Sequence, residues 1–470
     1  MRQMWFSGFL ILLLGVGYIG WLALKSSTGV PHLTLMSSGT SAGGELLPNL
    51  QRPSADVLLR IHGTNTIGVQ LAPALAQAYL KAQGVTNIST RTAGIDELAV
   101  IGLLSGKRQV IEIKEHGSAT AFRDLATGGC DIGMSARKIQ PSEVADFSGL
   151  GDMTSPASEH VLGMDGLAII VNRSNSLSQL SKQDIARIFT GDVKEWKEIG
   201  GSGGRIKLFA REAKSGTFET FKSLVLGGNT LSRSAARIED GRLLSKKVSQ
   251  EPDAIGFVAF QFVLDSKALA VSENGVKALL PTPLTVSTED YLLSRRLFLY
   301  TAANPTNPSV RHFVDFALSQ AGQQVVAANG FVAQYVRALP LSVPADAPPE
   351  YKRLTAGAER ISLDFRFRPG SVALGNKALP DLDRVRSFLS DPIYKGADIM
   401  LFGFTSNTGN QDVDCRLSKD LAQAVSDQFR QRGLNPSTVD GFCSDLPIAS
   451  NDTEDGREKN RRVEIWVKKH

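Results

Sequence analysis

The sequence lacks the basic surface that nucleic-acid-binding proteins need. Its 470 residues carry a net charge of only +5, and no stretch interleaves basic with aromatic residues as a nucleic-acid-binding face would. Hydrophobic residues make up 42% of the chain and charged residues 21%, which is typical of folded globular proteins. We therefore expect no nucleic acid partner. A mildly basic surface suits anionic ligands or a membrane surface.

The sequence also lacks the common signatures of catalysis and of metal binding. No grouping of histidine, cysteine, aspartate and glutamate has the spacing of metal ligands, and neither a P-loop nor a nucleophile elbow occurs. We expect no metal site, no cofactor and no enzymatic activity.

Cysteine is scarce, with three residues in the whole chain. Cys130 stands alone in the middle, whereas Cys415 and Cys443 both lie near the C-terminus. An exported chain meets an oxidising compartment, in which this last pair would form a disulfide. Three buried thiols are the alternative, and the sequence leaves both interpretations open.

One long apolar run opens the sequence, from Met4 to Leu24, between Arg2 and Lys25. It is long enough to cross a bilayer as one transmembrane helix, and the positive-inside rule sends the rest of the chain outward. A cleaved signal peptide is the alternative. Because neither a small-x-small cleavage site nor a cysteine for a lipid anchor follows the run, we expect residues 1–28 to form an inner-membrane signal-anchor.

The length predicts two or three domains. Residues 29–55, rich in serine, glycine, threonine and proline, and residues 340–354, rich in proline, are predicted linkers. Residues 56–339 alternate strand-like and helical apolar patterns, which indicates an α/β domain with strands at 57–61, 166–171 and 205–210. Residues 355–470 predict a smaller α+β domain.

Three segments of the α/β domain place a glycine-, serine- and threonine-rich loop between a strand and a helix: 63–68, 117–122 and 215–218. The first N–H groups of a helix lack intrahelical partners, and the helix dipole adds positive charge there. Small hydroxyl residues let the backbone approach an oxyanion. Each loop alone is typical of ordinary helix capping. Arg211, four residues before Ser215, adds a guanidinium that grips oxyanions well.

The segment Arg211–Thr217 resembles the Arg-x-x-x-Ser-Gly-Thr signature of the periplasmic phosphate-binding proteins of ABC transporters. Ile188–Gly191 with Trp196, and Asp253–Phe257, resemble further motifs of that family in the same order. The resemblance implies a two-lobed, periplasmic-binding-protein-like domain that closes on its ligand. It also implies a set of anion-contacting residues: Thr66, Ile67, Ser118, Arg211, Ser215, Gly216 and Thr217.

One position departs from that family. The segment Asp131–Arg137 matches a family segment with an aspartate where this chain has Ala136. That carboxylate would accept a hydrogen bond from the protonated oxygen of phosphate, which sulfate lacks. Its loss should weaken discrimination among oxyanions, because Ser135 and Arg137, two further candidate contacts, offer mainly donors. Phosphate is the first candidate ligand.

Two histidines, His62 and His116, stand immediately before the first two loops. Protonated, they would add positive charge to the site below about pH 6.5. Histidines in such places are more often structural, bonded to a neighbouring carbonyl, and we prefer that interpretation.

The end of the sequence resembles a second family. The run Asn451–Ile465, together with Gly403–Gly409 and Leu417-Ser418, is similar to the OmpA-like peptidoglycan-binding domain. The resemblance spans residues 361–467 and implies an α+β sandwich that grips the peptide stem of the cell wall.

In this second family an aspartate and an arginine bond the charged ends of the wall's diaminopimelate. The chain has Ser406 and Leu421 at those places, and Asp414 replaces a family asparagine. Charge-assisted hydrogen bonds contribute roughly 1.5–3 kcal/mol each, so we expect weakened binding of peptidoglycan. Asn460 and Arg462 are interpreted as structural. The remaining candidate contacts are Thr405, Asn407, Arg457 and Arg461.

The sequence thus predicts a membrane-anchored periplasmic solute-binding protein for phosphate or a related oxyanion, with an OmpA-like domain that associates with the cell wall. An ABC permease is the partner that this hypothesis implies. The alternative hypothesis is a structural envelope protein that links the inner membrane to peptidoglycan and whose anion site is vestigial or regulatory.

Overall fold

The computed structural model describes residues 56–147, 149–213, 215–368 and 371–470. The predicted signal-anchor helix and the first predicted linker lie outside these ranges. Within them, no helix is both long enough and apolar enough to cross a bilayer.

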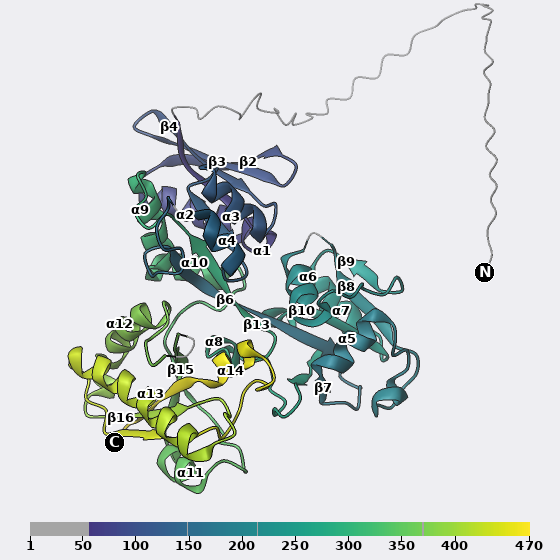
Figure 1. The fold of residues 1–470 in the computed structure, drawn as a ribbon. Helices are drawn as coiled ribbons and strands as arrows, with labels where there is room; N and C mark the ends of the chain where they lie inside the picture. The colour runs from purple at the N-terminus through teal and green to yellow at the C-terminus, as the bar shows by residue number, and fades with distance from the viewer. Residues whose placement is uncertain (1–55, 148, 214, 369–370) are drawn as a thin grey trace, which may run out of the picture. The chain divides into compact units, whose positions relative to one another are not determined.

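The first lobe of the α/β domain is built on one half of a large mixed sheet (Figure 1). Its centre holds the mutually parallel neighbours β4 (Lys107–Lys114), β1 (Val57–Gly63) and β5 (Ile132–Ser135). The antiparallel strands β3 (Glu97–Leu104) and β2 (Thr86–Gly94) extend the edge beside β4. Parallel neighbours end at the same edge, so the loops that follow β1, β4 and β5 come together there.

Helices cover both faces of this half of the sheet. The core on one face joins Leu59 and Ile61 of β1 to apolar side chains of four helices, and Phe122 and Leu125 pack on the other face. The helices of this lobe are α1 (Asn65–Gly68), α2 (Leu71–Ala82), α3 (Ser118–Ala126), α4 (Pro141–Val144), α9 (Pro308–Leu318) and α10 (Gln320–Ala328). The predicted alternation of strands and helices is confirmed here.

One long strand runs through both lobes. β6 (Glu159–Val171) pairs with β13 (Ser294–Tyr300) through its first half and with β10 (Ala254–Ala259) through its second half. Figure 1 shows β6 running from one lobe into the other. The predicted strand 166–171 is therefore only the second half of a strand whose first half belongs to the first lobe.

The second lobe continues the sheet through β8 (Lys207–Arg211) and β9 (Ala236–Ile238). β8 begins two residues later than the predicted strand 205–210. The rings of Phe189, Phe221 and Phe257 pack together in its core, beside the buried Trp196. Its other elements are α5 (Lys182–Thr190), α6 (Gly216–Phe221), α7 (Gly241–Gln250), α8 (Pro283–Ser287), β7 (Gln179–Ser181), β11 (Lys267–Ala268) and β12 (Ala270–Ser272).

The C-terminal domain is a separate sheet with the strand order β14-β15-β18-β16-β17. One face packs against α12 (Ala378–Leu389) and α13 (Gln411–Gln431), and Trp466 and Phe402 lie in a second core on the other face. The remaining elements are β14 (Ala338–Pro340), β15 (Glu359–Arg366), β16 (Asp398–Phe404), β17 (Thr438–Gly441), α14 (Glu454–Asn460) and β18 (Arg462–Lys468).

The segment predicted as a proline-rich linker, residues 340–354, belongs to this domain's structure. Pro340 ends β14, which pairs with β15, and α11 (Pro349–Thr355) follows. The ring of Tyr351 packs edge-on against Phe402 and Trp466 on the sheet. Prolines begin α11, where a missing N–H leaves no hydrogen bond unmade.

Buried charges join the C-terminal sheet to the α/β domain. Arg360 of β15 pairs with Asp290 at 3.0 Å and with Asp364 at 2.8 Å, and Arg366 donates to the carbonyl of Thr288 at 2.7 Å. Removing one partner of such a buried pair costs about 3–5 kcal/mol, because the other charge is left uncompensated. This charge cluster therefore fixes the segment that leads into β13.

Candidate anion-binding site

The loops after β1, β4 and β5 meet as the parallel arrangement requires. The N–H of Gly117 donates to the carbonyl of Gly63 at 2.8 Å, and the N–H of Thr64 donates to the carbonyl of Met134 at 3.0 Å. These backbone hydrogen bonds tie the first two predicted loops to the end of β5. The first two predicted loops therefore lie together at one edge of the sheet.

In the first loop, Thr64 caps α1 and accepts a hydrogen bond from the N–H of Thr66 at 3.3 Å. The hydroxyl of Thr66 faces the second lobe, as described below. Ile67 contributes its side chain to the core, and its N–H donates to the carbonyl of Thr64 at 3.2 Å. Thr64 and Thr66 are thus the residues of this loop whose hydroxyls face the second lobe.

The second loop and the end of β5 contact each other directly. The hydroxyl of Ser118 accepts a hydrogen bond from the N–H of Ala136 at 3.2 Å. The Ser135 hydroxyl donates to the carbonyl of Arg137 at 2.7 Å. Arg137 forms a two-point ion pair with Glu143, at 2.8 and 2.7 Å, which raises the pKa of its guanidinium. Arg137 and Ser135 therefore use these groups inside the first lobe.

In the second lobe, Arg211 ends β8. Its Nε donates to the carbonyl of Glu239 at 2.8 Å, and its Nη1 donates to the hydroxyl of Thr217 at 3.3 Å. Burial lowers the pKa of its guanidinium. The hydroxyl of Ser215 is buried and finds no hydrogen-bond partner among the described residues. Buried polar groups normally have hydrogen-bond partners, so a hydroxyl without one, in a loop whose Thr217 is bonded to a guanidinium, suits a bound oxyanion.

The two lobes touch at the predicted anion residues. The carbonyl of Gly216 lies 3.5 Å from the hydroxyl of Thr66. A Cβ added at Gly216 would lie 2.4 Å from the Cα of Thr66. Only glycine allows this approach, so the first and third loops face each other across the junction of the lobes.

Three charged residues at this junction were not predicted from the sequence. The Oε2 of Glu219 accepts hydrogen bonds from the hydroxyls of Thr64 and Thr66, at 2.9 and 3.2 Å. Arg295 donates to the same Thr66 hydroxyl at 2.8 Å and pairs with Asp165 at 3.3 Å. Asp165 and Arg295 interrupt otherwise largely apolar strands, and such interruptions are the signal that the sequence offered.

The histidines before the loops have structural partners. His62 Nδ1 lies 2.8 Å from a carboxylate oxygen of Asp124, and burial lowers the pKa of its imidazole. His116 lies 3.4 Å from the carbonyl of Ile95. The partner of His62 is thus a carboxylate rather than the expected carbonyl, while that of His116 is a carbonyl. Both agree with a structural role.

The OmpA-like loop lies after β16. Leu421 is 0% exposed and belongs to the sheet's core, and Ser406 is 4% exposed. The N–H of Asn407 donates to the side chain of Asn451 at 3.2 Å, and Thr408 donates to Asp414 at 2.6 Å. The buried hydroxyl of Thr405 has no partner within the part of the chain that the structure describes.

The two candidate arginines of this domain contact the domain itself. Arg457 donates to the carbonyl of Asn451 at 2.8 Å, and both Arg457 and Arg461 pair with Glu454. Asn460 accepts from the N–H groups of Ile448 and Ala449, as a structural residue would.

Arg462 is likewise internal, since it pairs with Glu464 at 2.9 Å.

Cys415 and Cys443 are joined in a disulfide, and Cys130 is a buried free thiol. Of the two interpretations that the sequence left open, the structure adopts the disulfide.

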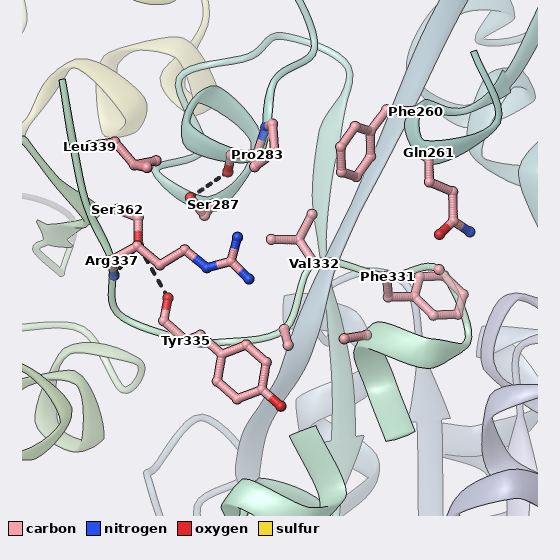
Figure 2. A pocket seen from close by; sticks show the side chains of 13 residues that line it. Phe260, Gln261, Pro283, Ser287, Phe331, Val332, Tyr335, Arg337, Leu339 and Ser362 are labelled. Atoms are coloured by element: carbon pink, nitrogen blue, oxygen red, sulfur yellow. Dashed lines mark hydrogen bonds between the residues drawn. The ribbon is translucent and has the colours of Figure 1, made fainter. Parts of the chain in front are cut away.

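A cavity of about 190 Å³ lies away from the candidate site, and none of the predicted anion residues lines it. Figure 2 shows the side chain of Arg337 extending into it near Ser287 and Tyr335. In the described ranges, no group of three or more metal-ligating side chains is found.

Two family models match the sequence. A model described as a PBP superfamily domain matches residues 94–321, and a model of the OmpA family matches residues 366–461. These matches agree with the two resemblances and with their order along the chain.

Several known proteins are similar to the α/β domain. A phosphate-binding protein PstS of Bacillus subtilis is 30% identical over 223 residues, which cover 47% of this chain and 70% of that protein. A phosphate-binding protein PstS of Borreliella burgdorferi is 24% identical, over 46% of this chain and 77% of that protein. The crystal structure of an ABC-type phosphate transport receptor from Vibrio cholerae is 22% identical, covers 58% of this chain and 99% of its own, and has a TM-score of 0.46.

Proposed function

The chain belongs to the PstS family of phosphate-binding proteins, and on that premise we propose that its α/β domain binds phosphate between its two lobes. One observation carries the proposal. At the junction where Thr66 meets Gly216, the buried hydroxyl of Ser215 has no partner among the described residues. Arg211, which donates to Thr217 of the same loop, supplies a positive charge. The relatives are named as binding proteins and not as enzymes, which supports a binding role for this chain too.

The ligand set that we propose combines both lobes. Thr66, Ile67 and Ser118 come from the first lobe, and Ser135 and Arg137 belong to the set only if an entering anion displaces their present internal contacts. The second lobe contributes Arg211, Ser215, Gly216 and Thr217. Hydroxyl and N–H donors at helix starts suit an oxyanion held with little net charge.

The cell envelope is the location that fits both families. We propose that the α/β domain and the C-terminal domain, which begins with β14, both lie outside the inner membrane, with residues 4–24 as the anchor. An ABC permease is the transport partner that this function implies. The OmpA-like domain would associate with the cell wall, with weakened affinity because Ser406 and Leu421 replace the charged pair.

The test is titration calorimetry on protein freed of bound anion. We expect phosphate to bind with a submillimolar Kd. Arg211→Ala should weaken binding at least about tenfold, since a charge-assisted hydrogen bond contributes roughly 1.5–3 kcal/mol. Arg205→Ala, which removes an exposed arginine before the same strand, should leave the Kd unchanged.

Absence of any binding heat for phosphate would overturn the proposal. The buried charges between Arg360 and Asp290 would then favour the second candidate, a structural envelope protein that holds its domains together rigidly. That candidate predicts that Arg211→Ala leaves function in the cell intact, whereas deletion of the residues after Pro349 abolishes it.

A further inference from the structure

A carboxylate faces the anion-binding loop from the opposite lobe. Glu219 lies on α6, and its Oε2 accepts hydrogen bonds from Thr64 at 2.9 Å and from Thr66 at 3.2 Å. These hydroxyls stand at the helix start that we propose as part of the anion site. The carboxylate oxygen of Glu219 therefore takes up the hydroxyls of the loop where we expect an oxygen of the anion to bind.

A buried ion pair lies beside this carboxylate. Arg295 also reaches Thr66, but it pairs with Asp165, and the two side chains are only 9% and 8% exposed. Thr220 donates to the same Asp165 carboxylate at 2.8 Å. Asp165 therefore offsets the charge of Arg295. The charge of Glu219 instead acts on the first lobe, where it helps Glu143 to raise the pKa of the Arg137 guanidinium.

The charge has a direct consequence for selectivity. An oxyanion that carries a proton can donate a hydrogen bond to Glu219, whereas a fully deprotonated oxyanion brings two negative oxygens together without one. Hydrogen phosphate and hydrogen arsenate keep a proton near neutral pH, but sulfate and selenate do not. We infer that Glu219 makes the site selective for protonated oxyanions.

This inference rests on the proposed function, and it changes the expectation drawn from Ala136. Ala136 leaves the first lobe without a carboxylate at the end of β5. The acceptor comes instead from the second lobe, 153 residues away from Thr66 in the sequence. Lobe closure would therefore bring the selective group to the ligand.

A second role for Glu219 makes a different prediction. As a plain latch between the lobes, its hydrogen bonds to Thr64 and Thr66 would favour closure around any anion. Loss of such a contact between the lobes would weaken the binding of all anions by the same factor. Loss of a selective acceptor would instead change the ratio of the affinities for protonated and deprotonated anions.

The experiment is titration calorimetry of the full chain with phosphate, arsenate, sulfate and selenate near neutral pH. We expect the unmodified protein to bind phosphate and arsenate at least about 100-fold more tightly than sulfate and selenate. Glu219→Gln keeps the size of the side chain and removes its charge, and it should reduce that ratio at least about tenfold. Glu212→Gln, on the exposed loop before the same helix, should keep the ratio.

Three results would overturn the inference. The first is equal affinity of the unmodified protein for phosphate and sulfate, and the second is a Glu219→Gln variant with an unchanged ratio. The third is failure of all four anions to bind, which would overturn the proposed function as well. If Glu219→Gln does not fold, the comparison of arsenate with selenate on the unmodified protein still decides, because these anions differ chiefly in the proton.

Discussion

The anion-binding loops and the OmpA-like loop both keep the backbone frame of a recognisable family, but they differ in what their polar groups do. At the lobe junction, the Ser215 hydroxyl is left without a partner among the described residues, and Arg211 donates to Thr217 of the same loop. In the OmpA-like domain, Arg457 of α14 and Arg461 directly after that helix are paired with Glu454. Of that loop's candidate groups, the hydroxyl of Thr405 stays buried without a described partner.

The difference between the two regions separates what maintains a fold from what maintains a binding site. Backbone frames are maintained by core packing and hydrogen bonding, which act whether or not a ligand binds. Side chains that bind a ligand must instead remain free of hydrogen bonds to the protein itself. A buried donor without a partner lowers the stability of the fold by about 1–3 kcal/mol. Both regions keep one such hydroxyl, so the arginines make the difference: Arg211 donates to a carbonyl and a hydroxyl, whereas Arg457 and Arg461 pair with a carboxylate. An arginine that is not paired with a carboxylate of the protein is therefore a better indicator of a retained anion site than the motif that surrounds it.

The largest effect is expected from restoring the family arginine at position 421. Leu421 is fully buried in the core of the C-terminal sheet, so Leu421→Arg should lower the free energy of unfolding by about 3–5 kcal/mol. Leu421→Met, which conserves volume, should cost less than about 1.5 kcal/mol. Chemical denaturation measures both changes.

The stated difference between the two regions would be wrong if the double variant Ser406→Asp, Leu421→Arg folded with full stability and bound wall muropeptides. The site would then be two substitutions away from function. Its present hydrogen bonds to Asn451 and Glu454 would be a resting arrangement rather than a replacement for the ligand.

Local pattern predicted much of the anion site. The strands before the loops are apolar runs bounded by glycine, and Arg211 with Ser215-Gly216-Thr217 lies within one short segment, so residue order alone brings these groups together. Glu219 and Arg295 were missed for the opposite reason. Their roles arise only when α6 and β13 meet α1 across the lobe junction, and no local pattern encodes that meeting.

Two other differences also have physical causes. Arg137 was a candidate anion contact, but Glu143 six residues later offers a two-point ion pair at shorter range. Prolines in residues 340–354 suggested a linker, yet they begin a helix whose Tyr351 packs on the sheet. In both cases a nearby partner decided the conformation, and composition alone did not reveal that partner.

The next largest effect is expected at Gly216, and it tests whether the first and third loops close on the anion. Gly216→Val should weaken phosphate binding at least about 100-fold, or about 3 kcal/mol, because the added side chain would collide with Thr66 and hold the lobes apart. Gly228→Val is the matched control in the same lobe, since a Cβ there meets no atom within 4 Å. Calorimetry gives the affinities, and retained affinity in Gly216→Val would show that the two loops do not close on the anion.

The smallest effect concerns the disulfide between Cys415 and Cys443, which are 28 residues apart in the sequence. Its reduction should lower the free energy of unfolding of the C-terminal domain by about 2 kcal/mol, because the cross-link limits the unfolded chain. Melting with and without reductant measures this change, and Cys130→Ser separates it from effects on the buried free thiol. Phosphate affinity should stay within about twofold, since both cysteines belong to the C-terminal domain. A larger change in affinity would mean that the C-terminal domain influences the anion site. The ion pair of Arg360 with Asp290 would provide the connection, because Asp290 lies just before β13, and Arg295 of β13 donates to Thr66.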